Sequence, residues 1–257
     1  MKQSNYLKTG IKAAKTAGNY IKNNYSKKID LQYKENADFV TSVDITAEKK
    51  IISIIKQQYP NHSILGEESG KEIKNNDYLW IIDPLDGTTN FTMKNPFFNT
   101  SIALVKKNEI ILGVVYNPIS NELFYAEKNK GAYLNDKKIN VNNKKEISKS
   151  IIAFCHGSKN KNSIKKATKI YSKMKLKANH TRQLGAAALE LCYVACGRVS
   201  CFYMNDMNSY DVAAGAIIVK EANGKVSDFN NKKFNINSKD ILASNKKIHN
   251  DILKIIN

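Results

Sequence analysis

Apolar residues recur every three or four positions in two stretches near the start of the chain, and each stretch predicts an amphipathic helix. In the first, from 6 to 23, lysines separate the apolar positions, which are Leu7, Ile11, Ala14, Ala17 and Ile21. The second follows a polar turn at 34–44 and continues through Ile54, with isoleucines on its buried face: Ile45, Ile51, Ile52 and Ile55. Asp38 or Ser42 is a suitable cap for this second helix. We expect both helices to pack on a core.

Short apolar runs separated by turn residues occupy the middle of the chain and predict strands. They are expected at 78–82, 99–105, 109–116, 122–127 and 132–134, the last four as an antiparallel meander. Beyond 150 the pattern alternates between strand and helix. Strands are expected at 150–155, at 199–203 and near Val226 and Ile241, and helices at 164–174, 186–196, 212–222 and 248–256.

A lysine- and asparagine-rich segment at 135–149 is the best candidate boundary between these two patterns. We therefore predict an N-terminal α+β part over 1–140 and a C-terminal α/β part over 141–257, joined as one compact unit. Stacked layers of helix and sheet, with the functional site between the two parts, are the expected architecture.

Composition places the chain among ordinary globular proteins, with 257 residues, 42% hydrophobic and 25% charged. No apolar run reaches the roughly 20 residues that a membrane span needs, and the first residues lack the apolar core of a secretory signal. A cytoplasmic location without membrane association is the expectation. The four cysteines form neither a disulfide framework nor a C-x-x-C pair, so we expect buried free thiols.

The formal net charge of +18 suggests attraction to nucleic acid or another polyanion. However, only Arg182 and Arg198 among the 41 basic residues are arginines, the residue that bidentate phosphate and base recognition favours. A general bias of the chain toward Lys, Asn and Ile explains the charge more simply. A nucleic-acid partner is therefore an alternative that the composition does not favour.

One stretch combines the groups of a metal-assisted phosphate site. After the apolar run 79–82, the sequence D-P-L-D-G-T-T-N-F occupies 83–91. Asp83, Asp86 and the Leu85 carbonyl are suited to Mg²⁺, and the N–H groups of Gly87 and Thr88 to a phosphate. Such a run also forms simple turns, but its position directly after a strand favours catalysis. Mg²⁺ held there would neutralise phosphoryl oxygens, activate a water and stabilise the leaving oxygen.

Three motifs together resemble the inositol monophosphatase family of magnesium-dependent, lithium-sensitive phosphatases. They are D-P-L-D-G-T-T-N-F preceded by W-I-I, G-E-E-S upstream and Y-D-V-A-A-G downstream. The resemblance covers nearly the whole chain, with the motifs in the expected order and spacing. It implies a layered αβαβα sandwich of the inositol monophosphatase/fructose-1,6-bisphosphatase type. It also implies two or three Mg²⁺ ions per site, a small phosphorylated substrate and a homodimer.

Position by position, the resemblance implies the roles of the site residues. The metal ligands would be Glu67, Asp83, the Leu85 carbonyl, Asp86 and Asp211, although Tyr210 stands before the last where tryptophan is usual.

The catalytic residues implied are Glu67, which would help to polarise the attacking water, and Thr88, which would orient it through a hydrogen bond to Asp44. Lys34 resembles a family lysine near the water and the metals, and Glu68 is expected to lie outside the direct ligands. Phosphate or substrate contacts would come from seven residues: Asp86, Gly87, Thr88, Gly185, Ala186, Ala187 and Asp211.

Substrate choice is where the sequence departs from the family pattern. The family loop Gly-Thr-Ala appears as Gly185-Ala186-Ala187, without the hydroxyl, and Met204 stands where inositol phosphatases carry a sugar-binding glutamate. Losing an acceptor for a buried hydroxyl changes discrimination strongly, although Asp206 is a candidate to take over.

The expected function is Mg²⁺-dependent hydrolysis of inositol monophosphate or a related sugar phosphate by a metal-activated water. The alternatives are fructose-1,6-bisphosphatase, 3'(2'),5'-bisphosphate nucleotidase and histidinol-phosphatase activity. Thr-Asn-Phe after D-G-T favours the inositol or fructose-bisphosphate branch by resemblance. A basic RNA- or protein-binding module on a phosphatase fold is the alternative from a different class.

Overall fold

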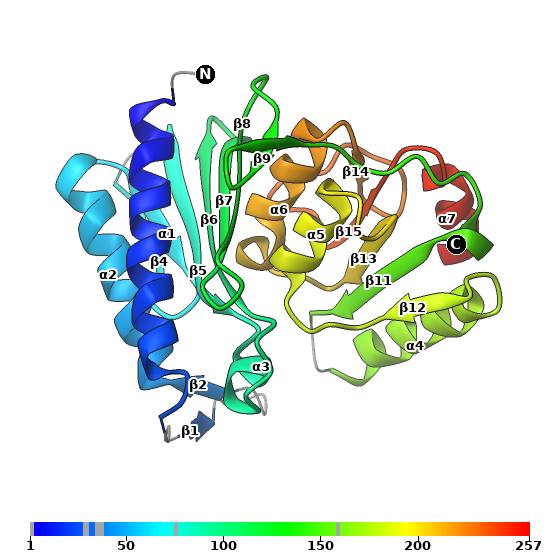
Figure 1. Ribbon diagram of the computed structural model, residues 1–257, viewed down its shortest axis with the longest axis horizontal. Coiled ribbons are helices and arrows are strands. Elements are labelled where there is room, and N and C mark those ends of the chain that lie inside the picture. Colours follow the sequence, from blue (N-terminus) through cyan, green and yellow to red (C-terminus); the bar gives the residue numbers. More distant parts are fainter. Residues whose placement is uncertain (1–2, 28–30, 34–38, 75–76, 158–159) are drawn as a thin grey trace.

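The computed structural model describes residues 3–27, 31–33, 39–74, 77–157 and 160–257, with only the backbone described for 31–33 and Phe39. Five layers are stacked across the molecule (Figure 1). Helices α1 (Asn5–Asn24) and α2 (Ser42–Gln58) cover one face of a large sheet, and α5 (Ala187–Ala195) and α6 (Ser209–Glu221) lie between it and a second sheet. Helices α4 (Lys161–Lys175) and α7 (His249–Ile256) cover the outer face of the second sheet. The predicted αβαβα layering is confirmed.

The large sheet has eight strands in the order β10-β9-β8-β7-β6-β5-β3-β4. All its neighbouring strands are antiparallel except β3 and β5, so the predicted meander is confirmed. The strands are β3 Ser63–Gly66, β4 Gly70–Glu72, β5 Tyr78–Asp86, β6 Asn99–Lys106, β7 Glu109–Asn117, β8 Glu122–Glu127, β9 Ala132–Leu134 and β10 Lys137–Ile139.

The second sheet has five strands in the order β12-β11-β13-β15-β14, with β11 parallel to both its neighbours. Its strands are β11 Ile151–His156, β12 His180–Arg182, β13 Cys201–Asn205, β14 Lys225–Ser227 and β15 Asp240–Ser244. A short hairpin and two single-turn helices complete the described structure: β1 Leu31–Tyr33, β2 Phe39–Thr41, α3 Thr88–Thr92 and the 3₁₀ helix Ile147–Lys149.

Several short elements were absent from the sequence prediction. Strands β4, β10 and β12 have three residues each and carry charged side chains, so they show no apolar pattern. Strand β10 lies inside the predicted boundary segment and still pairs with β9 of the large sheet. The division into parts at 140 remains a prediction.

The cap of α2 differs from the expectation. Thr41 is the N-cap, and its hydroxyl accepts the N–H of Val43 at 3.1 Å. Ser42 is already the first helical residue, and Asp38 lies outside the described residues. A capping box forms because the Asp44 carboxylate accepts the Thr41 N–H at 3.0 Å.

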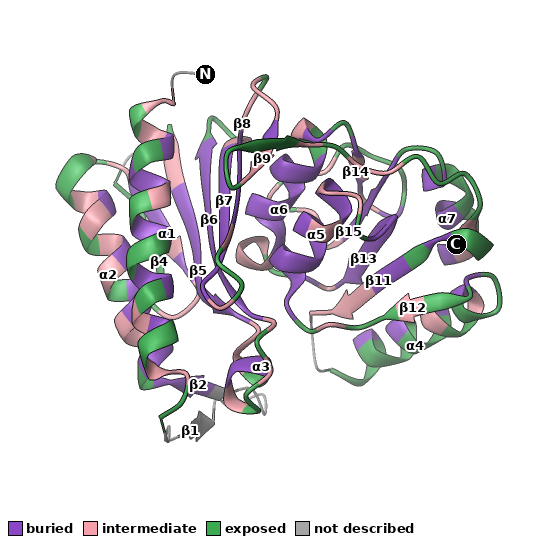
Figure 2. Cartoon of the chain, viewed as in Figure 1, coloured by how far each residue is buried: buried purple, intermediate pink, exposed green. Residues whose placement is uncertain are grey.

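Helices α5 and α6 are buried on nearly every side, as Figure 2 shows between the two sheets. A helix that is apolar all round is suited to such a central layer. The four cysteines are free; Cys192 and Cys201 are buried, whereas Cys155 and Cys196 are half-buried, so the prediction of buried thiols is confirmed for two. Among the described helices, none is both long and apolar enough to span a membrane.

His249 joins β14 and β15 to α7 through its ring. Its Nε2 lies 3.0 Å from the Ser227 hydroxyl and its Nδ1 lies 2.8 Å from the Ser244 hydroxyl. Burial, assisted by the positive charge of Lys225, lowers the pKa of His249 to about 4. The folded protein therefore holds this ring neutral down to a pH at which an exposed histidine is already charged.

The lowered pKa of His249 predicts that the folded protein loses stability at acidic pH. In the unfolded chain His249 has an ordinary pKa near ~6.5, so between that value and 4 the unfolded state binds more protons. We expect this residue to lower the free energy of unfolding by ~2 kcal/mol between pH 7.5 and pH 5. Urea unfolding of wild type and His249→Gln at both pH values measures it. Equal losses in the two proteins would contradict the assignment, because other groups would then account for the loss.

Candidate active site

Parallel strands β3 and β5 bring two predicted ligands together. Gly66 pairs with Ile82, and the Glu67 N–H donates to the Ile82 carbonyl at 3.1 Å. Glu67, the first residue after β3, and Asp83, which is still within β5, therefore lie side by side near the carboxyl ends of neighbouring parallel strands, where such sheets often place a site. The two carboxyl groups are hydrogen-bonded to each other.

A bulge in β5 turns Asp86 toward the same site. The strand continues four residues beyond its predicted end, and its pairing with β6 shifts between Asp83, opposite Ser101, and Asp86, opposite Asn99. Residues three apart in a regular strand point to opposite faces, and one extra residue removes that difference. Pro84 lies within the bulge, where its missing N–H disrupts no regular ladder.

Asp211 reaches the cluster from the other half of the chain, at the start of α6. Its carboxylate accepts the N–H of Asn208 at 2.7 Å in a capping box. Burial and the negative charges of Glu67, Asp86 and Asp211 raise the pKa of Asp83 well above its usual range. The four predicted acidic ligands thus lie near enough to repel one another.

The donor set fits a divalent cation in its chemistry. Carboxylate and carbonyl oxygens are the ligands that Mg²⁺ prefers, and a cation would relieve the mutual repulsion of these acids. Within the described residues, however, no three of them already stand in a metal-holding arrangement. Asp83 is hydrogen-bonded to Glu67, and one oxygen of Asp211 accepts a backbone N–H.

Asp86 is the most constrained of these acids. Its Oδ1 accepts the Ala187 N–H at 3.0 Å, and its Oδ2 accepts the Ala188 N–H at 2.8 Å and the Asn99 amide at 2.7 Å. Burial raises its pKa to about 6, although these hydrogen bonds oppose the shift. Two acceptor positions on each oxygen leave one free, on Oδ1, so Asp86 can bind a metal through a single oxygen.

Thr88 and Asp44 form the hydrogen bond that the family resemblance implies, at 3.1 Å. The Thr88 hydroxyl also lies 3.0 Å from the Leu85 carbonyl, so its one proton has two acceptors. Thr41 holds the second oxygen of Asp44 through its N–H and its hydroxyl, which leaves the first oxygen for Thr88. Burial raises the pKa of Asp44, against these hydrogen bonds.

The loop Gly185-Ala186-Ala187 lies against the motif, but its amides have other partners than a substrate. The Ala187 N–H is bound to Asp86, and a Cβ on Gly87 would lie 3.1 Å from the Ala186 Cβ. Gly87 also has φ 92°, which a side chain would strain. The predicted phosphate or substrate contacts of the loop and of Gly87 remain predictions.

Met204 is buried in β13, within the apolar core that the second sheet shares with α5 and α6. An apolar thioether therefore fills the position where the resemblance would place a sugar-binding carboxylate. Asp206 is half-buried with φ 50°, and its carboxylate lies 3.3 Å from the Asn205 amide nitrogen. Lys34, the remaining predicted site residue, lies outside the described residues.

The structure gives roles in the site to four polar residues for which the sequence analysis predicted none: Glu48, Asn90, Asn99 and Glu190. Glu48 is buried and accepts the N–H groups of Glu68 at 3.0 Å and Ser69 at 2.7 Å, which holds the turn that carries Glu67. Its position one helical turn after Asp44 was the available signal.

Asn90 and Glu190 hold the loop that precedes α5. The Asn90 amide donates to the Phe97 and Leu184 carbonyls, both at 2.7 Å, and so ties the motif to the second half of the chain. One oxygen of the buried Glu190 accepts the Leu184 N–H at 3.0 Å, whereas the other has no hydrogen-bond partner. Burial raises the pKa of Glu190 well above its usual range.

Comparison with known proteins assigns the family. The sequence profile of the Inositol monophosphatase family matches residues 2–257. The chain is 40% identical over 253 residues to "Nus factor SuhB" of Pasteurella multocida, covering 97% of this chain and 95% of that protein. It is 38% identical over 257 residues to "Inositol monophosphatase" of Mesembryanthemum crystallinum, covering 98% and 95%. The solved structure of extragenic suppressor protein suhB from Bartonella henselae matches with TM-score 0.94 and 33% identity over 98% of each chain. The chain therefore belongs to the inositol monophosphatase family.

Proposed function

We propose that the protein is a Mg²⁺-dependent phosphomonoesterase that hydrolyses inositol monophosphate or a related sugar phosphate. One observation carries the proposal: four acids from three separate segments, Glu67, Asp83 with Asp86, and Asp211, converge beside the hydrogen-bonded pair Thr88 and Asp44. Relatives that bear the name inositol monophosphatase support the same activity.

The proposed metal ligands are the four acids and the carbonyl of Leu85, a buried residue between Asp83 and Asp86. Bound Mg²⁺ would supply charge neutralisation and a water of lowered pKa. The rigid parts of the site come from the chain itself. Asn99 and the start of α5 hold Asp86, and Glu48 holds the turn after Glu67.

Thr88 is proposed to orient the attacking water. While its hydroxyl donates to Asp44, its oxygen can accept a proton of a water held next to Asp83 and Glu67. The buried Asp44 is itself held by Thr41, so the threonine has a fixed acceptor rather than a mobile one. This arrangement suits direct in-line attack by water and needs no covalent phosphoenzyme.

The test is a phosphate-release screen with Mg²⁺ over inositol, fructose, nucleotide and histidinol phosphates. We expect the highest kcat/KM for a sugar or inositol monoester and no release by Asp211→Asn. Asp86→Asn is a less specific test than Asp211→Asn, because it also disturbs the hydrogen bonds to the start of α5. Release from none of the four classes would refute the proposal, and preference for a nucleotide or histidinol phosphate would correct the substrate. Lithium inhibition and a homodimer remain family-based predictions.

Asn99 is not a proposed metal ligand, but we expect it to affect Mg²⁺ affinity because it holds Asp86. Its amide donates to Asp86 at 2.7 Å from the neighbouring strand β6. We expect Asn99→Ala to raise the Mg²⁺ concentration for half-maximal activity by about 10-fold to 100-fold, because Asp86 loses one of its three donors. A Mg²⁺ titration of activity measures this. A lower kcat with an unchanged Mg²⁺ requirement would contradict the role.

A second candidate function is binding of RNA or a protein through the basic surface. The net charge of +18 and the "Nus factor" name of close relatives favour it. Such binding would weaken steeply with log salt concentration and would survive Asp211→Asn. Flat salt dependence between 50 and 200 mM, roughly the range over which counterion release is large, would refute it.

A further inference from the structure

A cavity of about 500 Å³ lies at the far end of α6 from the candidate active site. Helix α6 begins near Asp211 and reaches the cavity with Ala216, Ile217 and Lys220. Along the helix, Ala216 lies five residues beyond Asp211, about 7.5 Å, and Lys220 nine residues beyond it, about 13.5 Å. None of the four clustered acids lines the cavity, so it is separate from the acidic cluster, which would repel an anion.

The apolar residues that line this cavity are buried or half-buried, whereas three of its four lysines are exposed, so we call the first its floor and the second its rim. The floor consists of five apolar residues: Ile110, Ala216, Ile217, Val226 and Phe234. The rim consists of four lysines: Lys220, Lys225, Lys233 and Lys246. Its volume is within the range of roughly 300–1,000 Å³ that small-molecule sites occupy.

The lysines are not neutralised by the one acid in the lining. Glu109 is paired with Lys128, 2.5 Å away. In the described part of the chain, Lys220, Lys233 and Lys246 form no ion pair, and Lys225 has only a 3.4 Å contact to the Asn250 amide oxygen. Hydrogen bonding from Lys128 lowers the pKa of Glu109, and Lys220 and Lys233 contribute, which places these ammonium groups near the same rim.

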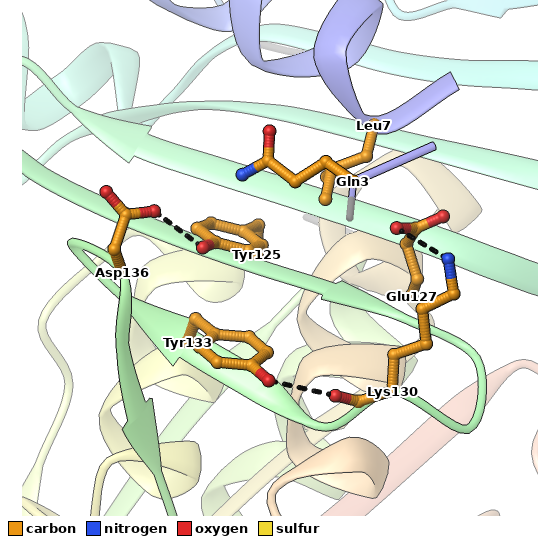
Figure 3. A pocket seen from close by; sticks show the side chains of 7 residues that line it. All are labelled: Gln3, Leu7, Tyr125, Glu127, Lys130, Tyr133 and Asp136. Carbon is orange, nitrogen blue, oxygen red and sulfur yellow. Dashed lines mark hydrogen bonds and ion pairs between the residues drawn. The ribbon is translucent and has the colours of Figure 1, made fainter. Parts of the chain in front are cut away.

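A second cavity, shown in Figure 3, makes the contrast clear. It holds about 180 Å³ between the start of α1 and strands β8 to β10. Its polar groups already satisfy one another: Tyr125 donates to Asp136 at 2.7 Å, and Lys130 pairs with Glu127 at 3.2 Å. After this pairing that cavity keeps one surplus negative charge, on Asp136, whereas the cavity at α6 has a surplus of cations.

We propose that the cavity at α6 is a binding site for a small amphipathic anion, with an aliphatic or aromatic body and one anionic head group. The body would contact Ile217, Val226 and Phe234, and the head would pair with Lys220 and Lys233. A hydrophilic anion such as inorganic phosphate would leave the apolar floor in water, and a neutral amphiphile would leave the lysines unpaired. The site is independent of the proposed phosphatase activity.

The probe is 8-anilinonaphthalene-1-sulfonate, titrated into the folded protein and followed by its fluorescence. We expect one saturable site from which decanoate displaces the probe at least 10-fold better than decanol or phosphate does. The double variant Lys220→Gln/Lys233→Gln should weaken probe binding at least 10-fold. Its matched control is Lys12→Gln/Lys15→Gln, which removes the same charge from exposed positions of α1 and should change binding less than twofold.

Three results would overturn the proposal. They are equal weakening in both double variants, displacement by decanol as strong as by decanoate, and the absence of a saturable site. Phe234→Ser tests the apolar floor separately and should also weaken binding, with circular dichroism verifying that this half-buried residue is not needed for folding. Unchanged probe binding in a folded Phe234→Ser protein would equally contradict it.

Discussion

Asp83→Asn is expected to lower phosphatase activity by more than about 1,000-fold without lowering the stability of the metal-free protein. Asp83 is nearly fully buried and surrounded by the carboxylates of Glu67, Asp86 and Asp211. A neutral amide of the same shape removes that repulsion and can still accept the Leu85 N–H, now 3.1 Å from Asp83 Oδ1. The same change removes the charge of a proposed metal ligand.

Two measurements distinguish this outcome from simple unfolding. In EDTA, the melting temperature of Asp83→Asn should equal or exceed that of wild type. Saturating Mg²⁺ should stabilise wild type by about 3 kcal/mol at 100 times its dissociation constant and should stabilise the variant far less. A variant that melts at a lower temperature than wild type in EDTA, or that Mg²⁺ stabilises as much as wild type, would contradict the role of Asp83 as a metal ligand.

Thr88→Val is expected to lower kcat by about 100-fold to 10,000-fold with little change in KM. Valine keeps the shape of threonine but cannot donate to Asp44 or accept a proton from water. The substitution should therefore weaken stabilisation of the transition state, which lowers kcat, and should leave substrate binding unchanged. Thr88→Ser keeps the hydroxyl and should retain activity within about tenfold.

The neighbouring residue provides the matched control. Thr89 is exposed in the same short helix, and Thr89→Val should leave kcat nearly unchanged. Asp44→Asn is a less clean test, because an amide N–H₂ would face the Thr41 N–H that now donates to the carboxylate. Equal losses in Thr88→Val and Thr89→Val would show that the helix tolerates no valine and would remove the support for a water-orienting hydroxyl.

Long apolar patterns predicted most of the fold correctly. Strands β8 and β9 were predicted to the residue, and the other meander strands and the main helices within a few residues. Local pattern was insufficient for β4, β10 and β12, which exist because a neighbouring strand supplies their hydrogen bonds. The predicted cap of α2 was wrong. Thr41 ends strand β2 as well as capping the helix, so no break in the polar run marked the start of the helix.

The site shows the same division between local and distant information. Asp83 to Thr88 stand together in the sequence, so their chemistry was readable from neighbouring residues. Asn99 is opposite Asp86 because of the register of β6, and the start of α5 reaches Asp86 across 101 residues of chain. No local pattern encodes such contacts.

By itself, the sequence determined the kinds of groups available: acids, a threonine and a glycine turn after a buried strand, and a methionine in place of a sugar-binding glutamate. The tertiary structure decided which of their atoms are free. It assigned three of the four acceptor positions of Asp86 to Asn99, Ala187 and Ala188, directed Thr88 to Asp44, and buried Met204 in the apolar core between the second sheet and α5 and α6. The physical reason is that residue type limits what a group can donate or accept, whereas packing decides which partner reaches it.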